Sequence, residues 1–234
     1  MRTRLGSVGF TLVEIIASMT LLSALALTLL AALRHIRESA DQAVCVSNLR
    51  QWGLALNLYA NDNDFFTPRR GQGIQPVEQV DRMDDWFNAL PPYLSLPSYS
   101  EQVRTGNPAR PGDKSVFVCP SAADSGKYRH FICYGMNMYL SYTRRPLPHR
   151  LVDLPQLSQL AFMADAPGGW ASTVPSSESY SVQPRHQGFA NVVFADGHVQ
   201  TFPGDYLGCG KGEPTRSDVR WNTLVPSDDF RDLP

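Results

Sequence analysis

The chain has 234 residues, of which 43% are hydrophobic and 18% are charged, and its formal net charge is −1. This length favours one domain of ordinary size, and the near-neutral charge excludes the strongly basic surface typical of nucleic-acid-binding proteins. No nucleic-acid partner is therefore predicted. The 18 prolines and 17 glycines predict a body rich in loops after an N-terminal helix.

An apolar segment dominates the N-terminal region. Arg2 and Arg4 precede it, and between Phe10 and Leu33 the only charged side chain is that of Glu14. About 24 residues are enough for a helix that spans a membrane. A carboxylate inside such a segment costs roughly 2.5–3.5 kcal/mol on insertion scales, so we expect Glu14 to have a partner.

Two simpler interpretations of this segment stay open, a secretory signal peptide cut after Ala26 and a plain membrane anchor. The position of Glu14 inside the apolar region, and the continuation of that region past Ala26, count against the signal peptide. Arg2 and Arg4 favour a cytoplasmic N-terminus, although Arg34 on the other side of the segment weakens this argument.

The helical pattern continues beyond the apolar segment. Apolar residues follow one another at steps of four, three, four and three, namely Cys45, Leu49, Trp52, Leu56 and Tyr59. This spacing places them on one helix face. We therefore predict one continuous helix from Phe10 to about Tyr59, roughly 75 Å long, with a transmembrane half at 10–33 and an amphipathic half at 34–60. The polar residues 61–64 favour turns and should end it.

The hexapeptide Gly-Phe-Thr-Leu-Val-Glu at positions 9–14, followed by this helix, resembles the cleavage and methylation segment of type IV prepilins and type II secretion pseudopilins. The resemblance implies that a prepilin peptidase cuts after Gly9, removes the leader 1–9, and that Phe10 is N-methylated. It also implies that Glu14 pairs with the N-terminal amine of a neighbouring subunit during assembly, which would remove two unpaired charges at once. Val8 departs from the family pattern, in which many members have Lys or Arg there, and this departure bears on processing efficiency.

The same resemblance implies a function, a location and partners. The chain would be a non-enzymatic structural subunit of a type IV pilus or a type II secretion pseudopilus. It would be a single-pass protein of a bacterial inner membrane, with a cytoplasmic N-terminus and a periplasmic head at 61–234, and would later enter the filament. The implied partners are other pilin or pseudopilin subunits, the prepilin peptidase and methyltransferase, and the inner-membrane assembly platform.

A second hypothesis treats the N-terminal helix only as an anchor that displays a head, and the head then binds a substrate or a surface ligand. Three aromatic residues in the predicted loops are candidates for such binding, namely Trp170, Tyr180 and Trp221. A contiguous apolar groove around them would favour this hypothesis.

Short elements are predicted in the head. Asp84 and Asp85 can cap a brief helix that carries Trp86 and ends at Pro91. Three apolar runs predict buried strands, at 115–119, 131–134 and 160–164. The predicted fold class is α+β and pilin-like, with the long N-terminal helix packed on a small, mostly antiparallel sheet with long loops.

A hairpin is predicted near the C-terminus. Asp196-Gly197 lies between two apolar runs, and this dipeptide favours a two-residue turn, in which Phe194 would face Val199. His186, nine further residues and then Asp196-Gly197 resemble the C-terminal motif of the prepilin-type processing-associated H-X9-DG domain, here at 186–197. The label of that domain implies no demonstrated activity.

Four side chains are candidate ligands of a structural divalent cation, zinc or calcium: His186, Asp196, His198 and Asp165. Imidazole and carboxylate groups suit such ions. The alternative is that Asp196-Gly197 only forms a turn and that the histidines hydrogen-bond to the backbone. A hydrolase that uses His186, Asp196 and His198 is a third hypothesis, but the sequence contains no recognised catalytic motif.

The four cysteines are Cys45, Cys119, Cys133 and Cys209. An oxidising periplasm would permit disulfides, and four cysteines allow three sets of pairings. We favour Cys45 with Cys119, because this bond would attach the helix to the head. Free buried cysteines that behave as small apolar residues remain the alternative.

Overall fold

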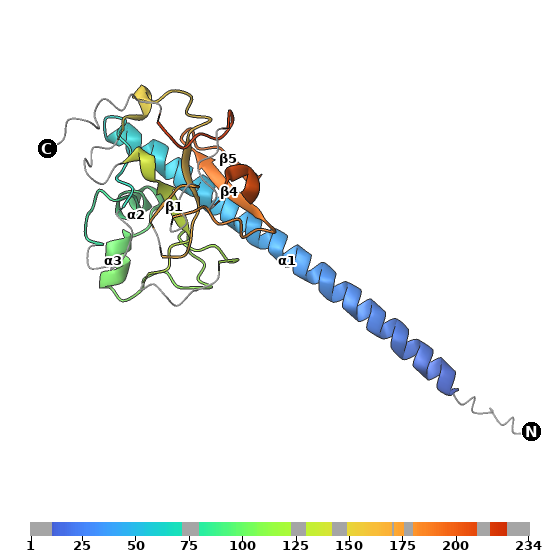
Figure 1. Ribbon diagram of the computed structural model, residues 1–234. Helices are drawn as coiled ribbons and strands as arrows, with labels where there is room; N and C mark the ends of the chain where they lie inside the picture. The colour runs from blue at the N-terminus through green and yellow to red at the C-terminus, as the bar shows by residue number, and fades with distance from the viewer. Residues whose placement is uncertain are drawn as a thin grey trace, which may run out of the picture. The chain divides into compact units, whose positions relative to one another are not determined.

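The structure is a computed structural model that describes residues 11–71, 80–122, 130–141, 149–169, 171–175, 180–209 and 216–223. It is α+β, and it divides into two compact units, Met1–Ala40 and Asp41–Pro234. Helix α1 (Leu12–Asp62) begins in the first unit and ends in the second, which also contains the sheet (Figure 1). The predicted continuous helix is therefore present.

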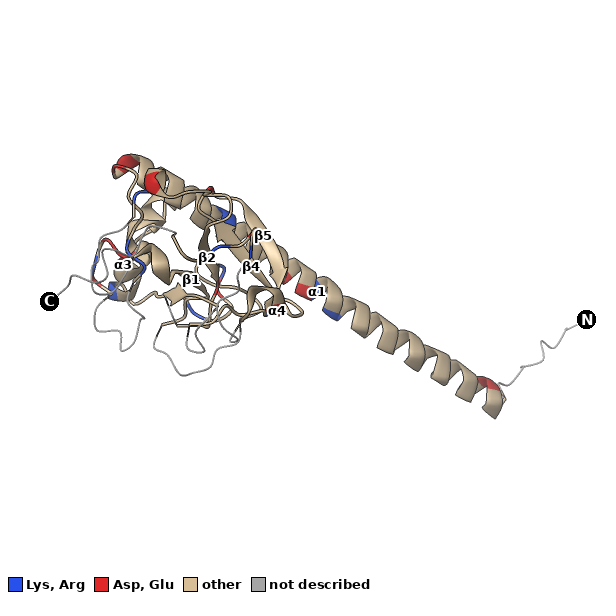
Figure 2. Cartoon of the chain, turned by 45° about the horizontal axis from the view of Figure 1, so that its top comes forward, with Lys and Arg blue, Asp and Glu red and all other residues tan. Residues whose placement is uncertain are grey.

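The first part of α1 is apolar and exposed. Every described side chain from Thr11 to Ala40 is exposed, and the stretch is almost entirely uncharged in Figure 2. Its length and composition are sufficient for a helix that crosses a membrane. The predicted processing residues Gly9 and Phe10 lie outside the described residues, as does Trp170.

The second part of α1 packs within the Asp41–Pro234 unit through the predicted face. Four of the five predicted face residues are completely buried, namely Cys45, Leu49, Trp52 and Leu56. The Trp52 ring packs edge-on against Trp86, with 5.1 Å between ring centroids. The helix ends at Asp62, where the polar residues 61–64 predicted it would end, and Asp64 has a positive φ of 50°.

Short helices follow α1. They are α2 (Trp86–Ala89), η1 (Pro91–Leu94), α3 (Tyr99–Arg104), η2 (Met138–Leu140), η3 (Leu151–Asp153) and α4 (Gly204–Leu207). Asp85 occupies the predicted N-cap of α2 but makes no side-chain capping hydrogen bond. Its carboxylate instead accepts hydrogen bonds from the guanidinium of Arg82.

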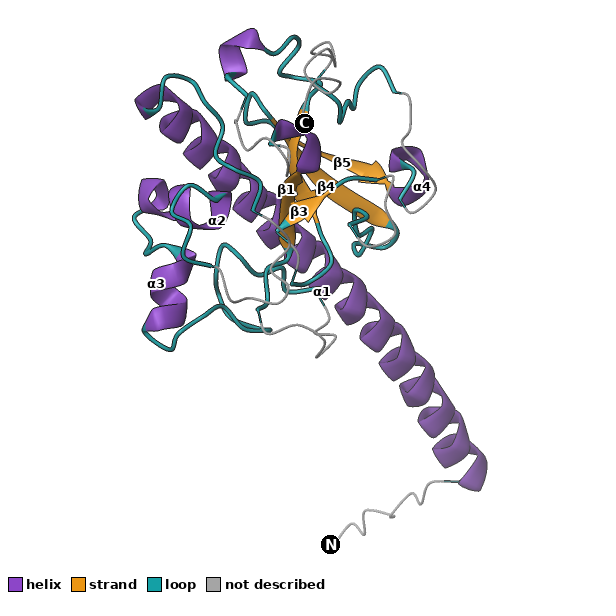
Figure 3. Ribbon diagram, turned by 60° about the vertical axis from the view of Figure 1, so that its left-hand side comes forward, coloured by secondary structure: helices purple, strands orange, loops and turns teal. Residues whose placement is uncertain are grey.

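The sheet has five strands in the order β3-β1-β2-β4-β5, and Figure 3 shows the strands in orange. The strands are β1 (Tyr134–Asn137), β2 (Ala161–Asp165), β3 (Ser172–Thr173), β4 (Phe189–Phe194) and β5 (Val199–Pro203). The β1–β3 pair is parallel and the other three pairs are antiparallel. The sheet is therefore mixed and mostly antiparallel, as predicted, with its one parallel pair among the described strands at the β3 edge.

The predicted strand at 115–119 is wrong, although the segment is largely buried. Two of its carbonyl groups accept hydrogen bonds from side chains of α1, and the Phe117 carbonyl accepts one from the Cys133 backbone nitrogen. Trp52 Nε1 donates to the Val116 oxygen at 3.1 Å, and Asn48 Nδ2 donates to the Val118 oxygen at 3.0 Å. An apolar run predicts burial, but it does not show whether the backbone pairs with a neighbouring strand or with side chains of a helix. The strand predicted at 131–134 begins only at its last residue, Tyr134.

The hairpin between β4 and β5 exists, but its register differs from the prediction by one residue. Val193 pairs with Val199, and the Phe194 amide donates to the His198 oxygen. Gly197 donates its amide to the Phe194 oxygen and has a φ of 93°. Three residues therefore lie between the paired residues Phe194 and His198, a loop length at which a glycine in the left-handed region is typical.

Candidate functional site

The start of α1 holds the only charged side chain of the apolar segment. The Glu14 carboxylate accepts hydrogen bonds from the Thr11 backbone nitrogen and from the Thr11 hydroxyl, both at 2.8 Å. The Glu14 backbone nitrogen lies 3.3 Å from the same hydroxyl oxygen. This reciprocal arrangement is a capping box. This local role was not predicted, although the Thr-x-x-Glu spacing before an apolar run is its signature.

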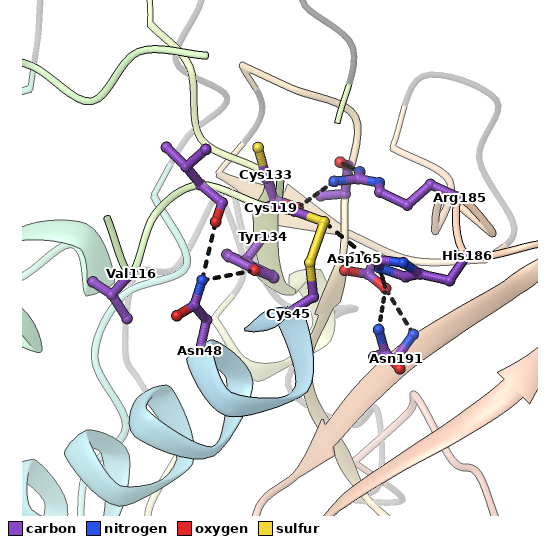
Figure 4. The surroundings of a disulfide bond; sticks show 12 residues. Cys45, Asn48, Val116, Cys119, Cys133, Tyr134, Asp165, Arg185, His186 and Asn191 are labelled. Carbon is purple, nitrogen blue, oxygen red and sulfur yellow. Dashed lines mark hydrogen bonds and ion pairs between the residues drawn. A yellow bond between two sulfur atoms is a disulfide. The ribbon is translucent and has the colours of Figure 1, made fainter. Parts of the chain in front are cut away.

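Cys45 of α1 and Cys119 form a disulfide, with 5.3 Å between their Cα atoms and 74 residues of sequence separation (Figure 4). The pairing favoured from the sequence is confirmed. Both residues are buried, and the bond attaches α1 to the segment at 115–119 that the Asn48 and Trp52 side chains also contact.

Two of the predicted metal ligands lie beside this disulfide. His186 precedes β4 and forms an isolated bridge with Phe189, and Asp165 is the last residue of β2. His186 Nε2 lies 3.6 Å from Cys119 Sγ and 3.7 Å from Asp165 Oδ2. One ligand atom from each of Cys45, Cys119, Asp165 and His186 lies within 4.8 Å of the others. We call these four residues the buried cluster.

The electrostatics of the buried cluster follow from its burial. Burial raises the pKa of Asp165 to about 6, although Arg185 and two hydrogen bonds from Asn191 act in the opposite direction. Burial also lowers the pKa of His186 to about 4, and the Arg185 charge adds to this effect. At neutral pH the contact is therefore between a carboxylate and a neutral imidazole, so it is not an ion pair.

The geometry does not form a nucleophilic triad. In a triad the carboxylate binds one ring nitrogen and the nucleophile faces the other. Here Asp165 and Cys119 both approach Nε2 of His186, and the Cys119 sulfur is bonded to Cys45. Among the described residues, His186 Nδ1 and Asp165 Oδ1 have no hydrogen-bond partner.

The other two predicted ligands form a separate pair in the hairpin turn. Asp196 Oδ1 lies 2.7 Å from His198 Nδ1 and accepts a hydrogen bond from the His198 backbone nitrogen at 3.1 Å. The His198 ring stacks on Phe194, with 4.3 Å between centroids. Both polar side chains are about two-fifths exposed. Asp196-Gly197 thus forms a turn, as the alternative interpretation expected, but the His198 ring contacts the Asp196 side chain and not the backbone.

The predicted four-ligand set is thus divided. His186 and Asp165 lie at the beginning of β4, whereas Asp196 and His198 lie beyond its end. The six residues of β4 span roughly 17 Å, so one ion could not contact both pairs. Spacing along the sequence could not reveal that Cys45 and Cys119 are the neighbours of His186, because tertiary packing brings them together.

The turn of the β4–β5 hairpin approaches α1 at Gly53. A Cβ atom at Gly53 would lie 2.8 Å from Val193 Cγ2 and 2.9 Å from the Gly197 Cα, closer than real side chains allow. Gly53 lies eight residues after Cys45 along α1, a distance of about 12 Å. The disulfide beside His186 and the contact of Gly53 with the hairpin turn therefore lie about two helix turns apart on α1.

Comparisons with protein-family models, with curated proteins and with solved structures found no match.

Proposed function

We propose that this chain is a structural subunit, a pilin or pseudopilin, of a type IV pilus or a type II secretion pseudopilus. It is made as an inner-membrane precursor, cleaved after Gly9 and methylated on Phe10. One observation carries the proposal: a single helix whose first part is exposed and apolar, with Glu14 as its only charge before Arg34. Apolar surface of this extent needs a cover, first the bilayer and then the helices of neighbouring subunits.

Glu14 is the assembly residue in this proposal. Its capping box supplies two hydrogen bonds from Thr11 but no positive charge. A negative charge in an apolar surrounding stays unfavourable until a cation neutralises it. Cleavage after Gly9 creates an amine, and the amine of a neighbouring subunit would meet the carboxylate in the filament.

The Asp41–Pro234 unit supports the same role. Its contacts to the second part of α1 include a disulfide, buried hydrogen bonds and a tightly packed aromatic cluster. A filament that holds its subunits by the helix needs the head to be attached to that helix in this way. A disulfide also fits a head in an oxidising compartment.

The display hypothesis receives less support. Trp221, one of its three candidate aromatic residues, is 98% buried and its side chain is part of the core. Tyr180 is only partly exposed. Neither residue offers the exposed aromatic surface that recognition of a ligand would require.

The test separates processing, capping and charge. In the native membrane, Gly9→Ala should leave the leader attached. Glu14→Gln keeps a side chain that can form the capping box but removes the charge, so the variant should be inserted and cleaved yet absent from sheared filaments. Thr11→Ala is the matched control, because it removes the hydroxyl of the cap and keeps the carboxylate.

N-terminal sequencing and immunoblots of membrane and filament fractions provide the readout. The proposal expects a mature end at methylated Phe10 and incorporation of Thr11→Ala but not of Glu14→Gln. Normal incorporation of Glu14→Gln would contradict the charge role. A native chain that retains residues 1–9, or that begins after Ala26, would contradict the whole proposal.

A further inference from the structure

We propose that the buried cluster of Cys45, Cys119, Asp165 and His186 is a zinc site whenever the Cys45–Cys119 disulfide is reduced. This site has a different ligand set from the one predicted from the sequence, and it does not depend on the proposed filament role. The metal and the disulfide are alternative ways of joining the same segments of the chain.

The distances between ligand atoms of the buried cluster suit zinc. Zinc is bound at about 2.3 Å by sulfur and about 2.0–2.2 Å by nitrogen and oxygen, so the ligand atoms of a tetrahedral site lie about 3.3–3.8 Å apart. His186 Nε2 lies 3.6 Å from Cys119 Sγ and 3.7 Å from Asp165 Oδ2. Two edges of the tetrahedron already exist. The other ligand atoms lie within 4.8 Å of one another, so shifts of about 1 Å would close the remaining edges, and the two sulfur atoms can separate once their bond is broken.

The donor groups of the buried cluster also suit zinc. Two thiolates, an imidazole and a carboxylate are ligands that zinc accepts, and four protein ligands make a closed structural site. Two thiolates and one carboxylate carry a charge of −3, so zinc would leave a net −1. The Arg185 guanidinium, which interacts electrostatically with both Asp165 and His186, would bring that total to zero.

Hydrogen bonds from neighbouring residues hold Asp165 and Arg185 in place. Carboxylate ligands of metals are usually held by hydrogen bonds from a second layer of residues. Asp165 Oδ2 already accepts bonds from the Asn191 backbone nitrogen at 2.7 Å and from its side-chain amide at 3.1 Å. Arg185 is in turn anchored by hydrogen bonds to the carbonyl oxygens of Cys133 and Ala166 (Figure 4).

Zinc can bind only while the disulfide is reduced. A dithiol reductant gives two electrons and two protons to the Cys45–Cys119 bond, which becomes two thiols, and the reductant becomes a disulfide. Zn²⁺ then binds the two sulfurs as thiolates and displaces their two protons. Before the disulfide first forms, the newly made chain carries the same two thiols and needs no reductant.

The site can be tested with Co²⁺, which reports thiolate ligands by a charge-transfer absorption. The full chain in detergent micelles is reduced with dithiothreitol, desalted without oxygen and titrated with Co²⁺. We expect one Co²⁺ per reduced chain with the thiolate band, displacement of Co²⁺ by Zn²⁺, and no such band in the oxidised chain. This comparison needs no substitution, so it does not depend on the folding of any variant.

Variants then identify the ligands. Cys45→Ser combined with Cys119→Ser should abolish the band, and His186→Ala should weaken Co²⁺ binding at least tenfold. The control combines Cys133→Ala with Cys209→Ala, which removes both cysteines outside the disulfide and should leave the titration unchanged. The proposal is overturned if the reduced chain shows no thiolate band, if the oxidised chain shows the same band, or if the double Cys45→Ser, Cys119→Ser variant retains it.

Discussion

Helix α1 is joined to the rest of the Asp41–Pro234 unit at two places that are held together in different ways. At Cys45 the contact is covalent and polar, with a disulfide, an imidazole and a carboxylate that are all buried. At Gly53 the helix has no side chain, and its backbone lies against the Val193 side chain and the Gly197 backbone. The first contact depends on redox state and protonation, whereas the second depends only on shape.

The two Asp–His pairs differ in a similar way. His186 and Asp165 are almost completely buried, and burial changes the pKa of each. His198 and Asp196 are partly exposed and form a local turn. Residue type therefore did not determine the role of either pair. Position relative to α1 determined it, because only the first pair lies beside the disulfide.

Removal of the covalent contact should have the largest effect. Cys45→Ala opens a loop of 74 residues, and closing a loop of that length stabilises a protein by about 4 kcal/mol in the chain-entropy description. We expect the free energy of unfolding of the head to fall by that order. Denaturation of the full chain in micelles, followed by tryptophan fluorescence, measures it.

Cys209→Ala is the matched control for this experiment. Cys209 is a free cysteine that is only partly buried, so its removal should change the midpoint of denaturation little. If Cys45→Ala and Cys209→Ala unfold at the same denaturant concentration, the covalent contact contributes nothing that the packing at Gly53 does not already supply.

The shape-dependent contact should have the next largest effect. In Gly53→Ala the new methyl group would meet Val193 and the Gly197 backbone at less than 3 Å. Overpacking of this kind typically costs about 1–3 kcal/mol, and a gain in helix propensity of about 1 kcal/mol offsets part of it. The net loss of stability should be smaller than that of Cys45→Ala. The same denaturation experiment measures it.

Leu54→Ala is the control for Gly53→Ala. Leu54 is the next residue of the helix, and 55% of it is exposed, so its truncation should leave the stability of the head nearly unchanged. A Gly53→Ala chain as stable as the unmodified one would show that the helix and hairpin can separate there at no cost.

These contacts also show how far the sequence alone reached. Local periodicity predicted α1 and its buried face, since one helix repeats the pattern over many residues. The Asp196-Gly197 dipeptide predicted the hairpin but not its register, because the dipeptide also fits a three-residue loop in which only the glycine has a positive φ. The neighbours of His186 could not be predicted, because Cys45 and Cys119 lie far from it in sequence. The spacing of Thr11 and Glu14 contained the capping box, which we overlooked.

The smallest predicted effect concerns pH, because the two buried groups oppose each other. The pKa of Asp165 is about 6 in the folded chain against an ordinary 3.8, so between these values the folded chain binds more protons. Stability then falls as the pH rises through that window. The pKa of His186 is about 4 against an ordinary 6.5, so the unfolded chain binds more protons and stability rises with pH. In the unmodified chain the two slopes offset each other.

Single substitutions should separate the slopes. His186→Gln leaves only Asp165, so its unfolding free energy should fall as the pH rises from about 4 to 6. Asp165→Asn leaves only His186, and its unfolding free energy should rise from about pH 4 to 6.5. The double variant subtracts the remaining titratable groups of the chain, since it lacks both contributions. Two single variants with parallel pH profiles would mean that burial does not govern the protonation of this pair, and the distinction between the buried and the exposed Asp–His pair would then have to be abandoned.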